Sequence, residues 1–373
     1  MKISDAITLL TSIFNYNLGQ YEKSLRTGKN LTNTYIIPFF VGDPGLGKTA
    51  IPKHVAAQLG VPYFQTIIAQ FDAGELAGLP FMTKMEVEPT IINADGTETK
   101  QAKVQVDRMI RLRPTYLPDP MTHDGKIGIY NLDELPQAFL ANQNICSQLV
   151  NEYRVGEHEI SPGITICCTG NKPENKAGTT SMPMHLRDRL MFIEIEADHD
   201  DFLRWATIND VDPRVRAYIK ENPKYLHKFE PGLNAFPSPR SWDKTSAILS
   251  MELPKHLRAA ALRGQIGDGV TTHFEQWLRV EDRLPKLQDV IDHPDKVEVF
   301  GNKDASILYL LLANLADVAN KENIGNIIKY VNRMPNQEFA AYWAQETFTK
   351  NEELLKVKAV TEWSLTRGAK LLY

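Results

Sequence analysis

The 373-residue chain is too long for one ordinary hydrophobic core, and its length suits two or three domains. Its 42 basic and 46 acidic residues leave a net charge of -4, so the bulk charge indicates neither a nucleic acid nor an anionic membrane as partner. A local basic stripe could still be hidden in that balance.

Neither an export signal nor a membrane span is expected. The first residues lack the basic region, apolar core and small-residue cleavage site of an export signal. The longest apolar run near the C-terminus, residues 307–313, is far shorter than the ~20 residues that span a bilayer. Cys146, Cys167 and Cys168 lack metal-binding spacing, and three buried thiols are typical of a reducing compartment. We therefore expect a soluble, cytoplasmic protein.

Hydrophobic spacing predicts three parts. Residues 1–30 hold an amphipathic helix, over residues 4–24, that is expected to pack on the part that follows. Strand and helix patterns alternate over residues 31–200, which predicts an α/β fold, a doubly wound parallel sheet with helices on both faces. Strand patterns nearly vanish after this point, so residues 201–373 are predicted to form an all-α lid and a C-terminal helical region.

Residues 42–49 match the phosphate-binding loop pattern G-x-x-x-x-G-K-S/T at every fixed position, between a predicted strand at 35–41 and a predicted helix at 48–59. Glycines let backbone N–H groups point at phosphate oxygens, and the helix presents its positive dipole end to the same anion. A glycine-rich turn without a ligand is the alternative, but it leaves the flanking strand and helix unexplained. The predicted nucleotide-binding residues are Gly42, Asp43, Pro44, Gly45, Leu46, Gly47, Lys48 and Thr49.

A second strand, at residues 63–69, is followed by a break in the alternation. Two strand-like runs, 83–92 and 101–112, flank Asp95-Gly96, which is a hairpin turn signal. We therefore predict an inserted β-hairpin near residues 83–112.

A third strand, at residues 126–132, ends in two acids, and a helix is predicted to begin at Leu135. Lys48 of the loop is expected to reach the β- and γ-phosphates, and Thr49 to offer its hydroxyl to Mg²⁺. Asp133 would hold a water of the Mg²⁺ shell, and Glu134 would act as general base toward the attacking water. An acidic helix start is the alternative, since acids favour that position. ATP and Mg²⁺ are the predicted cofactors.

Two further side chains are candidates for contact with the γ-phosphate. Asn171 follows the strand predicted at residues 164–169, where its amide could bind the phosphate or orient the water; a plain turn asparagine is the alternative. Ser238 and Pro239 predict a helix start with Arg240 in its first turn. A cation is unfavourable there unless it meets an anion, so Arg240 is expected to sense the γ-phosphate, unless it is an ordinary exposed arginine.

Arg187-Asp188-Arg189 precede the last predicted strand of the sheet, residues 190–196. An arginine at this place points out of its own site and could complete the site of a neighbouring subunit. Arg189 is favoured because it abuts the strand. A surface salt bridge with Asp188 is the alternative.

These landmarks together resemble the AAA+ ATPases, and within them the MoxR branch. The resemblance covers about residues 35–250. The segments that carry it are residues 71–80, 113–118, 132–135, 148–150, 153–157, 170–171 and 236–242.

The resemblance implies a homo-oligomer, a hexameric ring with ATP at its subunit interfaces. It also implies that the insert and a second hairpin, predicted at residues 153–160, face the pore. Tyr130-Asn131, an uncommon pair before the two acids, is not expected to touch a catalytic position. The implied roles are Walker A for Lys48 and Thr49, Walker B for Asp133 and Glu134, sensor 1 for Asn171, the trans arginine for Arg189 and sensor 2 for Arg240.

Three functions are consistent with this sequence. The first is a chaperone-like ATP-driven remodeller of a protein client, possibly with a von Willebrand factor A domain partner, that grips its substrate through apolar tips such as Phe81 and Met82. The second is a DNA-acting AAA+ motor or loader; the basic residues of the insert favour it, and nearby acids offset them. The third is a nucleotide-gated scaffold with little turnover, against which Glu134 and Asn171 argue.

Overall fold

The computed structural model describes residues 1–93, 96–172 and 181–365. Within them the chain forms two compact units: nearly all of residues 1–195 make up the first, and residues from 196 onward, together with the short segment 44–47, make up the second. Among the helices of these ranges, none is both long and apolar enough to cross a bilayer.

A five-stranded sheet forms the centre of the first unit. The strand order is β11-β1-β10-β7-β2, and all neighbouring strands are parallel. Because parallel strands need crossover connections, this order places helices over the sheet. The predicted parallel α/β fold with a helical C-terminal region is therefore confirmed. The strands are β1 (Pro38–Gly42), β2 (Tyr63–Ile67), β7 (Gly128–Asp133), β10 (Ile164–Asn171) and β11 (Met191–Ile195).

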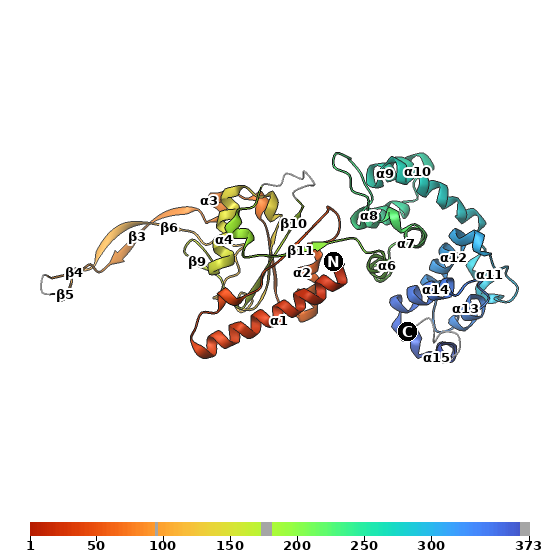
Figure 1. Cartoon of the computed structure of the whole chain (residues 1–373), viewed down its shortest axis with the longest axis horizontal. Helices are drawn as coiled ribbons and strands as arrows, with labels where there is room; N and C mark the ends of the chain where they lie inside the picture. The colour runs from red at the N-terminus through yellow and green to blue at the C-terminus, as the bar shows by residue number, and fades with distance from the viewer. Residues whose placement is uncertain (94–95, 173–180, 366–373) are drawn as a thin grey trace. The chain divides into compact units, whose positions relative to one another are not determined.

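Helices cover both faces of this sheet (Figure 1). On one face, Phe39 and Tyr130 share a buried core with residues of α4 (Leu140–Glu152). On the other face, α2 (Ala50–Leu59) contacts β7 and β2, and α1 (Ile3–Thr27) contacts α2 and β10. Buried apolar residues on both faces explain why the strands read as continuous apolar runs rather than as alternating patterns.

The N-terminal helix is joined to the sheet by a buried amide. The Nδ2 of Asn17 donates to the backbone oxygen of Ile36 at 2.9 Å, and the backbone N–H of Ile36 donates back to Oδ1 at 3.0 Å. Both hydrogen-bonding groups of the amide are thus satisfied inside the protein, which fixes α1 against the segment that leads into β1. The expectation that this helix packs on the following part is confirmed.

The region between β2 and β7 forms a long β-arm (Figure 1). After α3 (Ala73–Leu76), β3 (Pro80–Val87) pairs antiparallel with β6 (Val104–Arg111), and β4 (Thr90–Ile92) pairs with β5 (Glu98–Lys100) farther out. The inserted hairpin is therefore present. Of its predicted turn, Asp95 lies outside the described residues, while Gly96 has a left-handed φ of 82°.

Of the two expectations about the hairpins, the position of the second hairpin is confirmed and the place of Phe81 and Met82 is not. A second hairpin of β8 (Arg154–Val155) and β9 (His158–Glu159) forms where it was predicted. The expectation that Phe81 and Met82 are at a tip is wrong: both are exposed, but they lie in the first residues of β3, at the base of the arm. Being adjacent in the strand, they lie on opposite faces of the arm.

The second unit is built from helices around a single aromatic-rich core. Tyr218 lies at its centre, with ring centroids 5.3 Å from Trp242 and 4.8 Å from Phe274. Sequence patterns predict helices over residues 202–209, 213–221, 239–252, 254–263, 306–320 and 325–333, so helices α10, α11, α14 and α15 were not predicted. The α-helices are α6 (His199–Ile208), α7 (Pro213–Glu221), α8 (Pro239–Leu249), α9 (Lys255–Ile266), α10 (Asp268–Trp277), α11 (Leu287–Asp292), α12 (Ala305–Val318), α13 (Ile324–Val331), α14 (Gln337–Lys350) and α15 (Lys358–Leu365).

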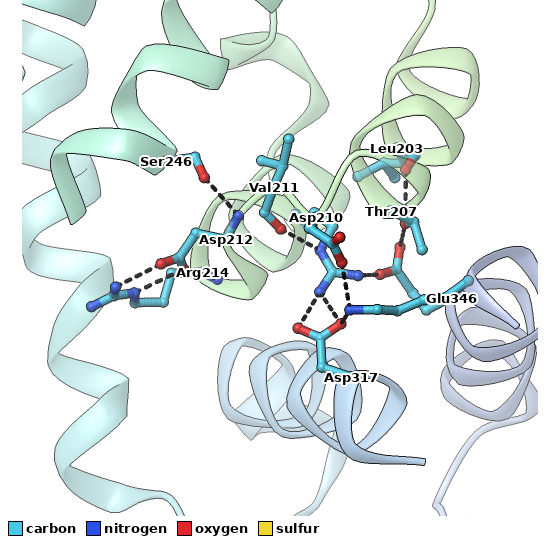
Figure 2. Close-up of polar contacts among 11 residues, drawn as sticks. Leu203, Thr207, Asp210, Val211, Asp212, Arg214, Ser246, Asp317 and Glu346 are labelled. Carbon is cyan, nitrogen blue, oxygen red and sulfur yellow. Dashed lines mark hydrogen bonds and ion pairs between the residues drawn. The ribbon is translucent and has the colours of Figure 1, made fainter. Parts of the chain in front are cut away.

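A buried ion cluster joins α6, α7, α12 and α14 of this unit (Figure 2). Arg216 is 1% exposed; it pairs with Glu346, and its Nη2 lies 2.7 Å from both oxygens of Asp317. Thr207 donates to Glu346 at 2.9 Å, and Lys350 reaches Asp317 at 2.8 Å. Burial raises the pKa of Glu346, and the positive charge of Arg216 opposes that shift. The cluster therefore depends on every partner being present.

We expect Arg216→Met to destabilise the second unit by about 3–5 kcal/mol, because it leaves the carboxylate of Glu346 buried without its cation. All five tryptophans lie in this unit, at positions 205, 242, 277, 343 and 363, so tryptophan fluorescence during urea denaturation reports its unfolding alone.

Two further variants separate the buried pair from a general effect of removing a cation. The double variant Arg216→Met/Glu346→Leu should regain most of the lost stability, since no buried charge is left unpaired. Lys356→Met removes an exposed partner of Glu353 and should leave the transition nearly unchanged. Arg216→Met with a wild-type transition would contradict the role of the cluster.

Candidate functional site

The carboxyl ends of β1, β10 and β7 lie side by side at one edge of the sheet. In the parallel register Gly42 is paired with Asn171, and Cys168 with Leu132, which precedes Asp133. Residues that follow three different strands in the sequence are thereby brought together. In open parallel sheets this edge is where ligands bind.

The loop after β1 has the backbone of a phosphate-binding loop. Gly45 and Gly47 have φ of 82° and 88°, a region that residues with a Cβ rarely adopt. The loop leads into α2 through Lys48 and Thr49. The first unit therefore has a P-loop α/β fold.

Lys48 is the buried cation of this edge, at 8% exposure. Its Nζ donates to the backbone oxygens of Gly42 and Asp43 at 3.1 and 2.7 Å, and to Oδ1 of Asn171 at 3.1 Å. The ammonium thus joins both ends of the loop to the end of β10. This contact brings Lys48 together with Asn171, as the sequence predicts.

Asp133 is the buried anion, also at 8% exposure. The hydroxyl of Thr49 lies 3.3 Å from both carboxylate oxygens, so the two residues predicted to hold the metal face each other. Oδ1 accepts hydrogen bonds from Thr169 and, at 3.0 Å, from the backbone N–H of Glu134, whereas Oδ2 accepts from Gln65 at 2.8 Å.

Three polar residues of this network were not predicted: Gln65, Asn131 and Thr169. Asn131 does not contact Asp133 or Glu134 itself; its Nδ2 lies 3.1 Å from Oγ1 of Thr169, which in turn contacts Asp133. The signal in the sequence is polar residues spaced two apart, which places 131 and 133 on one face of β7. A motif centred on the two acids does not include them.

Burial shifts two ionisable groups beside this network. It raises the pKa of the Tyr63 hydroxyl, whose oxygen lies 3.2 Å from Oε1 of Gln65. It also raises the pKa of the Cys167 thiol, and the negative charge of Asp133 adds to that shift. Both groups are therefore neutral hydrogen-bonding partners at physiological pH.

Glu134 stands on a turn with a left-handed backbone. Its φ is 54°, and its side chain is exposed. The expected helix start at Leu135 is wrong: a 3-10 turn spans Leu135–Gln137, and α4 begins at Leu140. The turn lies close against β10, since a Cβ on Gly170 would come within 2.3 Å of Cδ of Pro136. A left-handed non-glycine residue is strained and persists only where its surroundings fix it, as this contact does.

The two arginines lie at the opposite end of the sheet. Arg187 and Arg189 precede β11, whose first residue pairs with the start of β1. Five residues of strand separate that end from the loop, about 16 Å at 3.3 Å per residue. Nε of Arg189 donates to Asn151 at 2.9 Å, and the guanidinium of Arg187 lies 5.9 Å from the ring centre of Phe192. Neither arginine is placed to serve its own site.

Arg240 lies in the second unit, in the first turn of α8. Ser238 caps this helix by accepting from the backbone N–H of Ser241 at 3.2 Å, and Pro239 occupies the first position. The predicted helix start is therefore confirmed. The role of Arg240 as a phosphate sensor stays a prediction.

The residues at the loop edge suit a nucleotide with Mg²⁺. Among the described residues, no group of three or more His, Cys, Asp or Glu side chains could hold a metal ion. Mg²⁺ at nucleotide sites takes one or two protein oxygens and completes its shell with phosphates and water. Thr49 and Asp133 supply oxygens of that kind, so the donor set fits Mg²⁺ better than a transition metal.

Comparisons with known proteins add little to this geometry. No family model matches the chain, and no curated protein sequence does. Similar solved structures include two RuvB mutants of Thermotoga maritima, with TM-scores of 0.33 and 0.31 and identities of 14% and 15%; they cover 81% and 92% of this chain and 80% and 87% of theirs. NtrX of Brucella abortus with ATP has a TM-score of 0.30 and 14% identity over 95% of this chain and 66% of its own. TM-scores this low carry no argument.

We expect Lys48→Ala to weaken nucleotide binding about 10- to 100-fold, because a charge-assisted hydrogen bond contributes about 1.5–3 kcal/mol. A fluorescent ATP analogue titrated with protein measures the dissociation constant. Lys53→Ala removes an exposed lysine of α2, the helix that follows the loop, and should bind as the wild type does. Equal affinity of Lys48→Ala and wild type would refute the phosphate role.

Proposed function

We propose that the chain is an ATP-hydrolysing AAA+ protein of the MoxR type that works as a ring and remodels a protein partner. One observation supports the ATPase role above all. Lys48 contacts Asn171 across two neighbouring strands, while Thr49 faces Asp133 across the next. A loop that binds no phosphate has no need of a cation, an amide and an anion arranged in this way.

Each side chain then has a distinct task. Lys48 binds the phosphates, and Thr49 and Asp133 hold Mg²⁺, which when bound neutralises charge on the phosphate oxygens. Glu134, exposed on its strained turn, accepts a proton from the attacking water. Asn171 orients that water or the γ-phosphate from the end of β10.

The arginines give a reason for a ring. A site whose own chain places Arg187 and Arg189 at the far end of the sheet needs a cation from elsewhere, and a neighbouring copy can provide one. Such a head-to-tail interface closes into a ring when the rotation allows. In this proposal the ring is a hexamer, Arg189 acts in trans, and Arg240 couples the second unit to the nucleotide.

The β-arm favours a protein client over DNA. Of its basic residues, Lys100 pairs with Glu88 at 2.9 Å and Lys103 with Glu86 at 3.5 Å. Arg111 donates to the backbone oxygen of Gly78. Lys84 and Arg108 are the arm's other basic residues, and over residues 80–111 five acidic residues balance the five basic ones, which leaves no net positive charge for phosphates along the arm. A DNA-acting motor is therefore the weaker candidate, and salt-dependent binding of a labelled oligonucleotide distinguishes the two.

Apolar side chains on the arm suit a protein client. Directly opposite residues of antiparallel strands share a face, so the apolar pairs of Phe81 with Ile110 and of Met85 with Val106 lie on one side of the arm, with Thr83 and Arg108 between them. The turn of the second hairpin lies beside the base of the arm, where Glu157 accepts from the backbone N–H of Arg111. A von Willebrand factor A domain protein is one proposed partner.

We expect Glu134→Gln to lower the rate of ATP hydrolysis about 10²- to 10⁴-fold while ATP binding persists, because the amide cannot accept the proton. Phosphate release and binding of a fluorescent ATP analogue, measured on the same preparation, separate the two effects. The control Glu22→Gln changes an exposed carboxylate of α1 and should hydrolyse ATP normally. A wild-type chain that releases no phosphate would refute the proposed activity.

Arg189→Ala should abolish hydrolysis only through the neighbouring subunit. Mixed one to one with Glu134→Gln, itself inactive, it should regain activity at about a quarter of the sites, where an intact Glu134 meets an intact arginine across a head-to-tail interface. Phosphate release before and after subunit exchange measures this. If Arg189→Ala alone hydrolyses ATP normally, the same experiment with Arg187→Ala decides whether that arginine acts instead.

A further inference from the structure

The carboxylate of Asp133 is held at both oxygens by neutral groups that no phosphate-loop motif includes. Thr169 contacts Oδ1 from β10, and Gln65 contacts Oδ2 from β2, at 2.8 Å. The strands of these two residues flank β7 on either side. Asp133 therefore accepts hydrogen bonds from residues of both neighbouring strands. Its two oxygens are equally far, 3.3 Å, from the hydroxyl of Thr49.

The hydrogen bond from Thr169 to Oδ1 is the first of a series of hydrogen bonds that extends into the core, each with a defined donor. A threonine hydroxyl has one proton, which Thr169 can give either to Asp133 or to Oδ1 of Asn131, 3.2 Å away. The carboxylate is the stronger acceptor, so the proton points to Asp133. Nδ2 of Asn131 then donates to the Thr169 oxygen at 3.1 Å, and the neutral thiol of Cys167 faces Oδ1 of Asn131 at 3.7 Å.

The hydrogen bond from Gln65 to Oδ2, at the edge of the sheet, is supported by a further residue in the same way. The amide of Gln65 presents its nitrogen to Asp133 at 2.8 Å, because an ionised carboxylate only accepts hydrogen bonds, and its oxygen is then free to accept from the Tyr63 hydroxyl at 3.2 Å. The Tyr63 hydroxyl is the donor in that contact, and it thereby fixes which end of the amide faces Asp133. Each of the two donors to Asp133 is thus oriented by a further hydrogen bond: Asn131 donates to Thr169, and Tyr63 donates to Gln65.

We propose that Thr169 and Gln65 are positioning residues that fix the carboxylate of Asp133 toward Thr49 before Mg²⁺ arrives. This inference rests on the proposed nucleotide site. Buried carboxylates that bind metals are commonly oriented by such outer hydrogen bonds, whose loss weakens metal binding about 10- to 100-fold. The two residues belong to the metal site in function although neither touches the metal.

The test measures how much Mg²⁺ half-saturates the tight binding of a fluorescent ATP analogue, with binding in EDTA as the metal-free reference. Thr169→Val keeps the shape of the side chain but removes the hydroxyl, and it should raise the half-saturating Mg²⁺ about 10- to 100-fold. Thr169→Ser restores the hydroxyl and should return the value close to that of the wild type. Gln65→Leu, on an exposed position of the edge strand, should raise it in the same direction.

The matched control is Thr165→Val, which removes another buried threonine hydroxyl from β10, four residues before Thr169. It should leave the Mg²⁺ dependence unchanged, so a general effect of altering this strand is recognised. Binding in EDTA should be equal for all variants. This result is expected because the phosphates are held by the loop, not by Asp133.

One outcome would refute the proposed function, and another would refute only the positioning role of Thr169 and Gln65. If the wild type binds the analogue with no response to Mg²⁺, or not at all, the proposed function fails. If the wild type responds to Mg²⁺ but Thr169→Val and Gln65→Leu respond at the same concentration, the proposed function stands and the positioning role is refuted. Should Thr169→Val unfold, as a melting curve would show, Gln65→Leu alone decides between the two.

Discussion

The structure of the first unit depends on two opposite buried charges at one edge of the sheet, Lys48 and Asp133. A buried charge is costly unless neighbouring dipoles compensate it. Here the compensation comes from several strands: two loop carbonyls and Asn171 for the cation, Gln65 and Thr169 for the anion. The parallel register brings these groups together, so the site and the strand order have one physical cause.

The strands and the loop could be predicted because each has a local signature. A strand buried on both faces is a short apolar run, and a loop around phosphate needs glycines at fixed positions. Gln65, Asn131 and Thr169 could not be predicted in the same way. Their role arises from pairing between strands that are distant in the sequence, which places Asn131 and Thr169 3.1 Å apart. The start of α4 was mispredicted because Glu134 adopts a left-handed conformation that the sequence disfavours.

Sequence patterns also missed helices of the second unit that packing, not propensity, stabilises. Helix α10 carries Gly269 and the pair Thr271-Thr272, which are poor helix formers, yet Phe274 and Trp277 of this helix are buried in the core. Helix α14 is buried almost all round and includes Glu346 among its buried residues. Such a helix has no polar face to mark its period. It is compatible with the core only because Arg216 lies opposite.

The β-arm is the part of the first unit whose stability does not come from the buried core, since its strands are mostly exposed. A two-stranded hairpin is at best marginally stable in water. One face of this hairpin carries Phe81, Met85 and Val104, each about half exposed, beside Arg108, and the other face carries the exposed Met82 and Met109 beside Lys84 and Asp107. Exposed apolar patches of this kind mark contact surfaces. In the proposed ring, these exposed apolar side chains of the arm would be the surface that contacts a client.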